Sequence, residues 1–162
     1  LVFGGHAPPQ AYTESWDGSA WTEVGDLNQA RRALAGAGNQ TAALAAGGYT
    51  PSAAANNTEI WDGSSWTEVN NLNVARDEVA GAGSSTAALA SGGNTPPNTV
   101  ESWDGTNWTE VAELASARNY AGSAGTQTAA FVAGDSPHTS SSANATEEWN
   151  IPSSISNLTI TD

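Results

Sequence analysis

Cysteine is absent from the 162 residues of this chain, so the fold has neither disulfides nor a thiolate site for metal binding or nucleophilic catalysis. No run of apolar residues approaches the roughly 18 that are needed to span a bilayer, and membrane insertion is therefore not expected. Cytosolic and extracellular environments are both compatible with this composition.

Lysine is also absent, and four arginines face seventeen acidic residues, which gives a net charge of -13. This balance disfavours nucleic acid and anionic membranes as partners, because both require a cationic surface. Ten of the acids recur at fixed positions and predict a solvated face rather than a cation-binding patch. These are Glu14, Glu59, Glu101 and Glu147, then Asp17, Asp62 and Asp104, then Glu23, Glu68 and Glu110.

The chain contains an internal repeat. The first tryptophan of a Trp-Asp-Gly segment recurs at Trp16, Trp61 and Trp103, and in degraded form at Trp149, at intervals of 45, 42 and 46 residues. A period of this size is typical of repeat proteins whose units bury their apolar faces only against neighbouring units. We assign repeats near 1–28, 29–73, 74–115 and 116–150, followed by a tail or closing strand at 151–162.

Each repeat is predicted to form four short antiparallel strands, because its apolar segments are short and bounded by Gly, Pro, Asn or Asp. In the second repeat we expect strands at 31–38, 41–47, 58–61 and 66–69. The last two enclose an Asp-Gly turn, which makes the flanking tryptophans cross-strand partners. The tryptophans are therefore predicted to be structural: Trp16 and Trp21, Trp61 and Trp66, Trp103 and Trp108, and Trp149.

The first strand of each repeat consists almost entirely of Ala and Gly, which suits strands that converge on an axis. The predicted fold class is therefore all-β, a β-propeller segment of about 3.5 four-stranded antiparallel blades. An inner strand is missing at the start, and the segment 156–161 could fill the outer position at the end, but the short tail cannot supply both strands. We expect no closed ring from this chain alone, and further upstream blades or several chains in one assembly.

The order of Arg, Gly-rich strand, apolar strand ending in Gly-Gly, and Glu-x-Trp-Asp resembles the kelch repeat. The diglycines Gly4-Gly5, Gly47-Gly48 and Gly92-Gly93 fit kelch better than WD40, whose opening Gly-His is absent. The fourth repeat departs from the pattern, with Asp135 after Gly134 and Ser154 at the second Trp position. The near-identical Trp-Asp-Gly units and the acidic balance are also similar to those of virion-associated proteins of marine bacteriophages. The copper chemistry of the kelch enzyme galactose oxidase needs a Cys that this chain lacks.

Repeat lengths differ mainly in the connection between the second and third strands, at 6–12, 49–57, 94–99 and 136–145. Loops on a rigid scaffold commonly carry binding residues, although neutral drift explains length variation equally well. The candidate binding residues on this face are His6, Tyr12, Tyr49, Asn56, Asn94 and His138. The two histidines lack metal-ligand spacing. We predict no catalytic, metal or cofactor site.

Three of the four arginines, Arg31, Arg76 and Arg118, occupy one repeat position. This recurrence favours a structural ion pair with a repeated acid such as Glu59 or Glu101 over a ligand contact.

These features predict a non-enzymatic binding or structural module that contacts a protein or glycan surface and completes its ring by self-association or further blades. The phage resemblance implies a tail or fibre component, extracellular or virion-associated. Two alternatives remain: the scaffold of a propeller enzyme whose catalytic groups lie elsewhere, and a purely structural assembly subunit.

Overall fold

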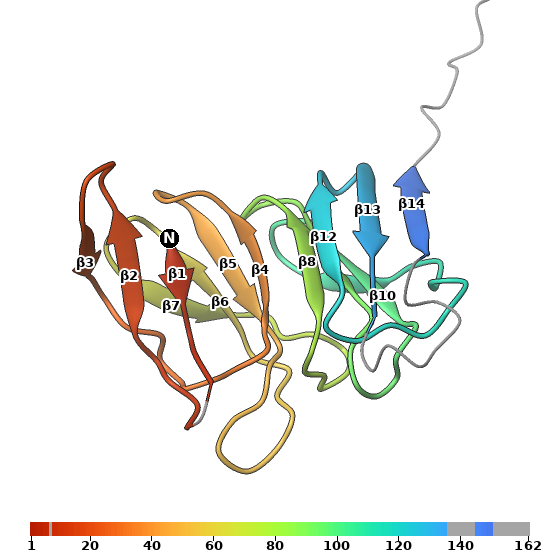
Figure 1. The fold of residues 1–162 in the computed structure, drawn as a ribbon, viewed down its shortest axis with the longest axis horizontal. Helices are drawn as coiled ribbons and strands as arrows, with labels where there is room; N and C mark the ends of the chain where they lie inside the picture. The colour runs from red at the N-terminus through yellow and green to blue at the C-terminus, as the bar shows by residue number, and fades with distance from the viewer. Residues whose placement is uncertain (7, 136–144, 151–162) are drawn as a thin grey trace, which may run out of the picture.

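The computed structural model describes residues 1–6, 8–135 and 145–150, and within them the chain is all-β, with fourteen strands and no helix. The strands form four antiparallel sheets that follow one another from one end of the molecule to the other (Figure 1). The first sheet contains β1 (Val2–Phe3), β2 (Thr13–Trp16) and β3 (Trp21–Glu23). The second contains β4 (Ala35–Gly38), β5 (Ala43–Ala46), β6 (Thr58–Trp61) and β7 (Trp66–Val69).

The third sheet repeats the second, with β8 (Ala80–Gly83), β9 (Ala88–Ser91), β10 (Val100–Trp103) and β11 (Trp108–Glu110). The fourth contains β12 (Gly122–Gly125), β13 (Ala129–Ala133) and β14 (Thr146–Asn150). The prediction of an all-β chain is confirmed, and no sheet closes on itself within the described residues. The strand predicted at 41–47 for the second repeat is the shorter β5, and the segment 156–161 lies outside the described residues.

The Gly-rich strand of the second sheet begins four residues later than predicted, at Ala35 rather than Arg31. Ala33 has a φ of 52°, a left-handed conformation that interrupts an extended strand. Arg31 and Arg32 instead form isolated bridges with Gln10 and Tyr49. The segment before the strand is therefore a connection between neighbouring elements.

The Trp-Asp-Gly segment forms the predicted hairpin. Trp61 lies directly opposite Trp66 in the register of β6 and β7, with ring centroids 5.6 Å apart. The Asp62 carboxylate accepts hydrogen bonds from the backbone N–H groups of Ser64 and Ser65 at 2.8 and 2.9 Å. Hydrogen bonds from the Ser65 backbone and from Ser64 lower the pKa of Asp62 to about 2. The Asp62 side chain thus stabilises the turn, as predicted.

The Gly-rich strands β4, β8 and β12 lie side by side, which explains their small residues. A β-carbon at Gly81 would lie 2.6 Å from the carbonyl oxygen of Gly36 in the neighbouring sheet, too close for any side chain. At the equivalent place in β12, Ser123 fits, and its hydroxyl donates to the Gly81 carbonyl oxygen at 2.8 Å.

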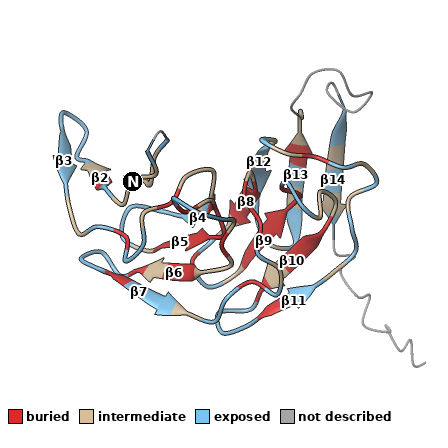
Figure 2. Cartoon of the chain, turned by 90° about the horizontal axis from the view of Figure 1, so that it is seen from below, coloured by how far each residue is buried: buried red, intermediate tan, exposed pale blue. Residues whose placement is uncertain are grey.

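The core lies between the sheets, and Figure 2 shows burial concentrated in the second and third. Trp103 and Trp108 pack in one cluster with Leu44, Ala46 and Leu72, which belong to the preceding repeat. The Trp108 indole N–H donates to the Thr58 hydroxyl at 3.0 Å across this contact. Trp66 donates in the same way to Thr13. The second and third sheets are therefore each stabilised by the face of the sheet before them.

The repeated arginines form the predicted ion pairs. Arg31 contacts Glu59 at 2.7 Å and Arg76 contacts Glu101 at 3.0 Å, and all four side chains are almost completely buried. Burial lowers the pKa of Arg76, and the Glu101 carboxylate opposes that shift. Arg118 pairs with Glu147 at 2.9 Å, but Glu147 is 21% exposed. The guanidinium groups also bind backbone carbonyls, as Arg76 does at Thr99 with a distance of 2.9 Å.

Replacement of Trp61 by Ala is expected to lower the free energy of unfolding by about 3–5 kcal/mol, because it empties a buried aromatic site. The matched control is Trp16→Ala, whose indole occupies the same repeat position but is 41% exposed, so its cost is expected to be clearly smaller. Urea denaturation followed by circular dichroism measures both. Equal losses in the two variants would contradict the packing role of the preceding sheet.

Replacement of Arg76 by Met is expected to cost about 3–5 kcal/mol, since Glu101 would be left charged and buried without its partner. Arg118→Met is the control: the partly exposed Glu147 retains contact with water, so the loss is expected to be smaller. Thermal unfolding of both variants at neutral pH tests this order. A larger loss for Arg118→Met would show that the buried pair is not what determines the cost.

Candidate functional site

One repeat position holds the backbone in the same unusual conformation while its side chain changes. Ala33, Glu78 and Tyr120 follow the repeated arginine by two residues and have φ angles of 52°, 61° and 50°. The Glu78 N–H donates to the Ala33 carbonyl at 2.7 Å, and the Tyr120 N–H donates to the Glu78 carbonyl at 3.1 Å. Residues other than Gly adopt this conformation infrequently, and such backbone strain is concentrated at functional sites. The position therefore presents three different side chains on one fixed scaffold.

The residue before this position adds further polar groups. Arg32 lies over the ring of Tyr49, with the guanidinium carbon 4.7 Å from the ring centroid. The backbones of Arg32 and Tyr49 exchange two hydrogen bonds, of 3.0 and 2.8 Å, which fix this stacking. Asp77, the equivalent of Arg32 in the third sheet, is almost fully buried. We call the set Arg32, Tyr49, Asp77, Glu78 and Tyr120 the Arg32 cluster.

The members of the Arg32 cluster that come from three different repeats interact electrostatically. Partial burial raises the pKa of Tyr120, and a hydrogen bond with Glu78 raises it further. The charge of Asp77 acts in the same direction, whereas the charge of Arg32 opposes it. Tyr120 is nevertheless 53% exposed. The cluster thus combines one cation, two carboxylates and an accessible phenol ring.

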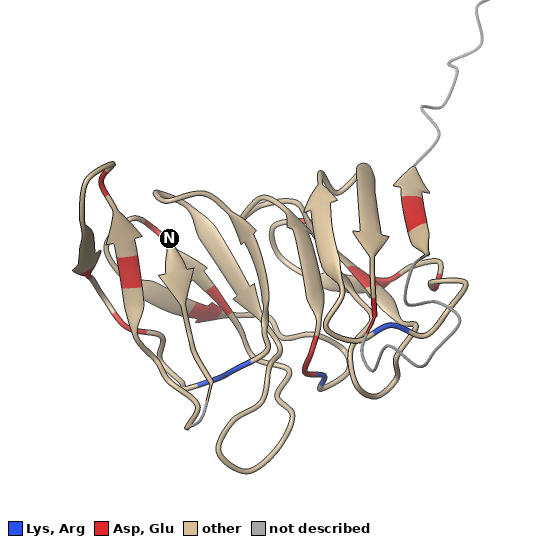
Figure 3. Ribbon diagram, viewed as in Figure 1, with Lys and Arg blue, Asp and Glu red and all other residues tan. Residues whose placement is uncertain are grey.

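The Arg32 cluster lies on the side of the molecule predicted to carry binding residues. Figure 3 shows the charged residues at the starts of β4 and β8 on the edge where the connection after β5 also emerges. Two hydrogen-bonded contacts join these connections: Tyr49 with Arg32, and the Asn94 N–H with the Asp77 carbonyl at 2.9 Å. The connections after the second strand and before the first strand therefore share one face.

The structure brings only part of the predicted set together. Tyr49 joins the Arg32 cluster, and Asn94 contacts it through its backbone. His6 and Tyr12 are exposed. The Asn56 side chain instead donates to the Leu72 carbonyl at 3.1 Å, a contact that holds the scaffold. His138 lies outside the described residues.

The ends of the variable connections are part of the scaffold. The backbone N–H groups of Arg31, Arg76 and Arg118 donate to carbonyl oxygens of Gln10, Ala55 and Pro97, respectively. These hydrogen bonds join the connection after the second strand of one repeat to the segment that precedes the first strand of the next. Length variation is therefore confined to the tips of these connections.

Sequence reasoning missed Arg32, Asp77, Glu78 and Tyr120. Two sequence features could have pointed to these residues. Arg32 is the one arginine outside the repeat period, and the two residues after the repeated arginine differ in every repeat that contains it. Their convergence depends on the left-handed backbone at Ala33, Glu78 and Tyr120, which the residue types themselves do not favour.

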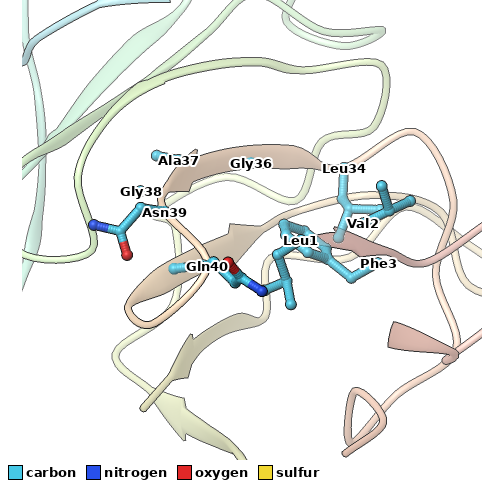
Figure 4. A pocket seen from close by; sticks show the side chains of 10 residues that line it. Leu1, Val2, Phe3, Leu34, Gly36, Ala37, Gly38, Asn39 and Gln40 are labelled. Carbon is cyan, nitrogen blue, oxygen red and sulfur yellow. The ribbon is translucent and has the colours of Figure 1, made fainter. Parts of the chain in front are cut away.

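A groove of about 420 Å³ lies beside β1 and β4 (Figure 4). Leu1, Val2 and Phe3 form one side and Gly36 the other, with Asn39 and Gln40 at one end. It occupies the place where the second and third sheets have a Gly-rich strand, because the first sheet contains none within the described residues. The groove is lined by no charged side chain, and we assign it to packing rather than chemistry.

A smaller cavity of about 60 Å³ separates the third and fourth sheets, lined in part by Leu89, Val100, Leu114 and Trp149. These residues are equivalent to those around Trp108 at the preceding contact. The fourth repeat has Ser154, outside the described residues, at the second Trp position. The cavity therefore marks a departure of the last repeat from the repeated packing.

Comparison with known proteins gives no further assignment, since neither a family model nor a curated protein matches the chain. Within residues 1–6, 8–135 and 145–150, no three His, Asp or Glu side chains gather in a way that could hold a metal ion. The same residues contain no helix of the length and apolar character that crossing a bilayer requires.

Proposed function

We propose that this protein is a β-propeller-type binding module without enzymatic activity, and that its Arg32 cluster binds a neutral, hydroxyl-rich ligand such as a surface glycan. The observation that carries this proposal is the position shared by Ala33, Glu78 and Tyr120, where a repeated backbone presents side chains that differ. In a repeat protein, scaffold positions keep their residue type for packing, whereas differing positions that reach the surface are free to serve recognition. Here Ala33 and Glu78 are half-buried and Tyr120 is exposed.

The propeller architecture is supported by the arrangement of the Gly-rich strands. The strands β4, β8 and β12 approach one another closely, while the tryptophans fill the wider space between the outer strands. Propeller blades converge toward a central axis, so small residues are required near the axis and bulky residues fill the wider space farther out. The kelch resemblance of the repeats is compatible with this proposal, as is the extracellular or virion-associated setting predicted from sequence.

The chemistry of the Arg32 cluster favours a neutral ligand. Glu78 supplies acceptors and Arg32 supplies donors, and these groups fix the orientation of a polar ligand. Asp77 is almost fully buried and contributes its charge. Tyr120 offers half of its surface to solvent, so a ring is accessible for apolar contact. An anionic ligand is disfavoured because one guanidinium faces two carboxylates in a chain of net charge -13.

Screening on a glycan array followed by calorimetric titration of the best ligand tests the proposal. Tyr120→Ala and Arg32→Ala are each expected to weaken binding about 10-fold or more, the effect of roughly 1.4 kcal/mol. Tyr12→Ala is the control, because Tyr12 is an equally exposed tyrosine outside the Arg32 cluster, and it should leave affinity unchanged. The proposal is wrong if Tyr12→Ala abolishes binding while both cluster variants retain it.

A further inference from the structure

The two end sheets expose residues that the inner sheets bury. Trp16 and Trp21 are 41% and 50% exposed, whereas Trp61, Trp66, Trp103 and Trp108, at the same repeat positions, are at most 6% exposed. Val2, which is also exposed, corresponds to the buried Ala45 and Ala90. We call the surface formed by Val2, Trp16 and Trp21 the head face.

The opposite end of the molecule exposes the complementary half of the same contact. Phe131 on β13 is 44% exposed, whereas the equivalent Leu44 and Leu89 are 1% and 3% exposed. Leu44 is one of the residues that cover the tryptophans of the next sheet. We call the surface formed by Phe131 and Thr146 on the fourth sheet the tail face.

The hydrogen-bond donor and acceptor of each contact between sheets also lie on opposite sides of that contact. Thr13 and Thr58, on successive sheets, each accept a hydrogen bond of 3.0 Å from the indole N–H of the following sheet, Trp66 or Trp108. In the third repeat the threonine is replaced by Val100, which has no hydroxyl to accept a hydrogen bond. In the fourth repeat the second tryptophan, which would donate that hydrogen bond, is replaced by Ser154. The threonine acceptor and the tryptophan donor are thus lost together.

The fourth repeat restores the acceptor as Thr146. Within the described part of the chain, the Thr146 hydroxyl and the Trp21 indole N–H have no hydrogen-bond partner, and both side chains are exposed. The tail face therefore presents an acceptor and the head face a donor of the kind that meet twice inside the molecule.

From these observations we infer that two copies of this chain associate head to tail, with the head face of one copy packed on the tail face of the other. Trp16 and Trp21 then cover Phe131, as the inner tryptophans cover Leu44, and the Trp21 indole donates to the Thr146 hydroxyl. The interface is heterologous, because different surfaces of the two copies meet. A second contact of the same kind closes a ring if the rotation between copies allows it, and otherwise each assembly keeps one free face of each kind.

Each of the two faces also carries an acidic residue. Glu14 is equivalent to Glu59, which is covered by Asn28 and Arg31 of the connection from the preceding sheet. Glu14 lies on the middle strand of the first sheet, directly opposite Val2 of the head face, and no such connection runs between two separate chains to cover it. Glu148 is equivalent to Ser15, which receives the Gln40 side chain from the turn after β4. Glu148 lies directly opposite Phe131 of the tail face, and the first sheet has no equivalent turn within the described residues to reach it. These two carboxylates are therefore expected to weaken the contact.

Sedimentation velocity of the 162-residue chain over a range of concentrations tests this inference. The unmodified chain is expected to form dimers and larger species, and added salt should strengthen association by screening the repulsion between acidic copies. Trp21→Glu and Phe131→Glu should each be monomeric, since each places a charge in one face. Thr67→Glu, an exposed change on the outer strand β7 of an inner sheet, is the control and should associate normally.

A mixture of the two charged variants distinguishes head-to-tail contact from other contacts. The Trp21→Glu chain retains its tail face and the Phe131→Glu chain retains its head face, so an equimolar mixture should form dimers and nothing larger. This result also shows that both variants are folded. A monomeric unmodified chain, self-association of Trp21→Glu alone, or a mixture that stays monomeric while both variants retain their unfolding transitions would overturn the inference.

Discussion

The tryptophan pair of one sheet is buried by the smaller side chains of the sheet before it, and the other features of the fold depend on this contact. A sheet of three or four strands of two to five residues each has too little apolar surface to be stable alone. Stacking buries Trp103 and Trp108 against Leu44, Ala46 and Leu72. Since each sheet contributes one covering face and one covered face, the contact can be repeated along the chain without changing its chemistry.

The buried ion pairs set the geometry within which this stacking occurs. Arg76 binds the Gly92 and Thr99 carbonyls as well as Glu101, so one side chain from the segment before β8 holds the end of β9 and the start of β10 together. Glu101 in turn accepts hydrogen bonds from Asn73 in the connection from the preceding sheet. Burying these charges is costly. Their recurrence at Arg31 and Glu59 indicates that they fix the spacing and orientation of sheets rather than add net stability.

Features that depend on residue type and spacing could be predicted from the sequence. Cross-strand pairing of Trp61 with Trp66 follows from their separation around an Asp-Gly turn, and the pairing of Arg31 with Glu59 follows from their shared period. The Arg32 cluster could not be predicted in this way. It forms because Ala33, Glu78 and Tyr120 adopt a left-handed backbone that is imposed by contacts between sheets. The sequence predicts binding residues at the tips of the variable connections, whereas the polar groups converge just before the Gly-rich strands.

The same repetition explains both the site and the exposed ends. Inside the molecule, hydrogen bonds between equivalent backbones fix the Ala33, Glu78 and Tyr120 position, so side chains there can differ without loss of the fold. At the ends, the scaffold positions keep their residue types although no neighbouring sheet covers them. Trp21 and Thr146 keep the residue type of their repeat position although no sheet within the described chain covers them. Glu78 and Tyr120 show the reverse, because their residue types differ at a position that the repeated backbone holds fixed. The departure from the pattern at the position of Glu78 and Tyr120 therefore supports the proposed recognition of a ligand, and adherence to the pattern at Trp21 and Thr146 supports the proposed contact with another copy.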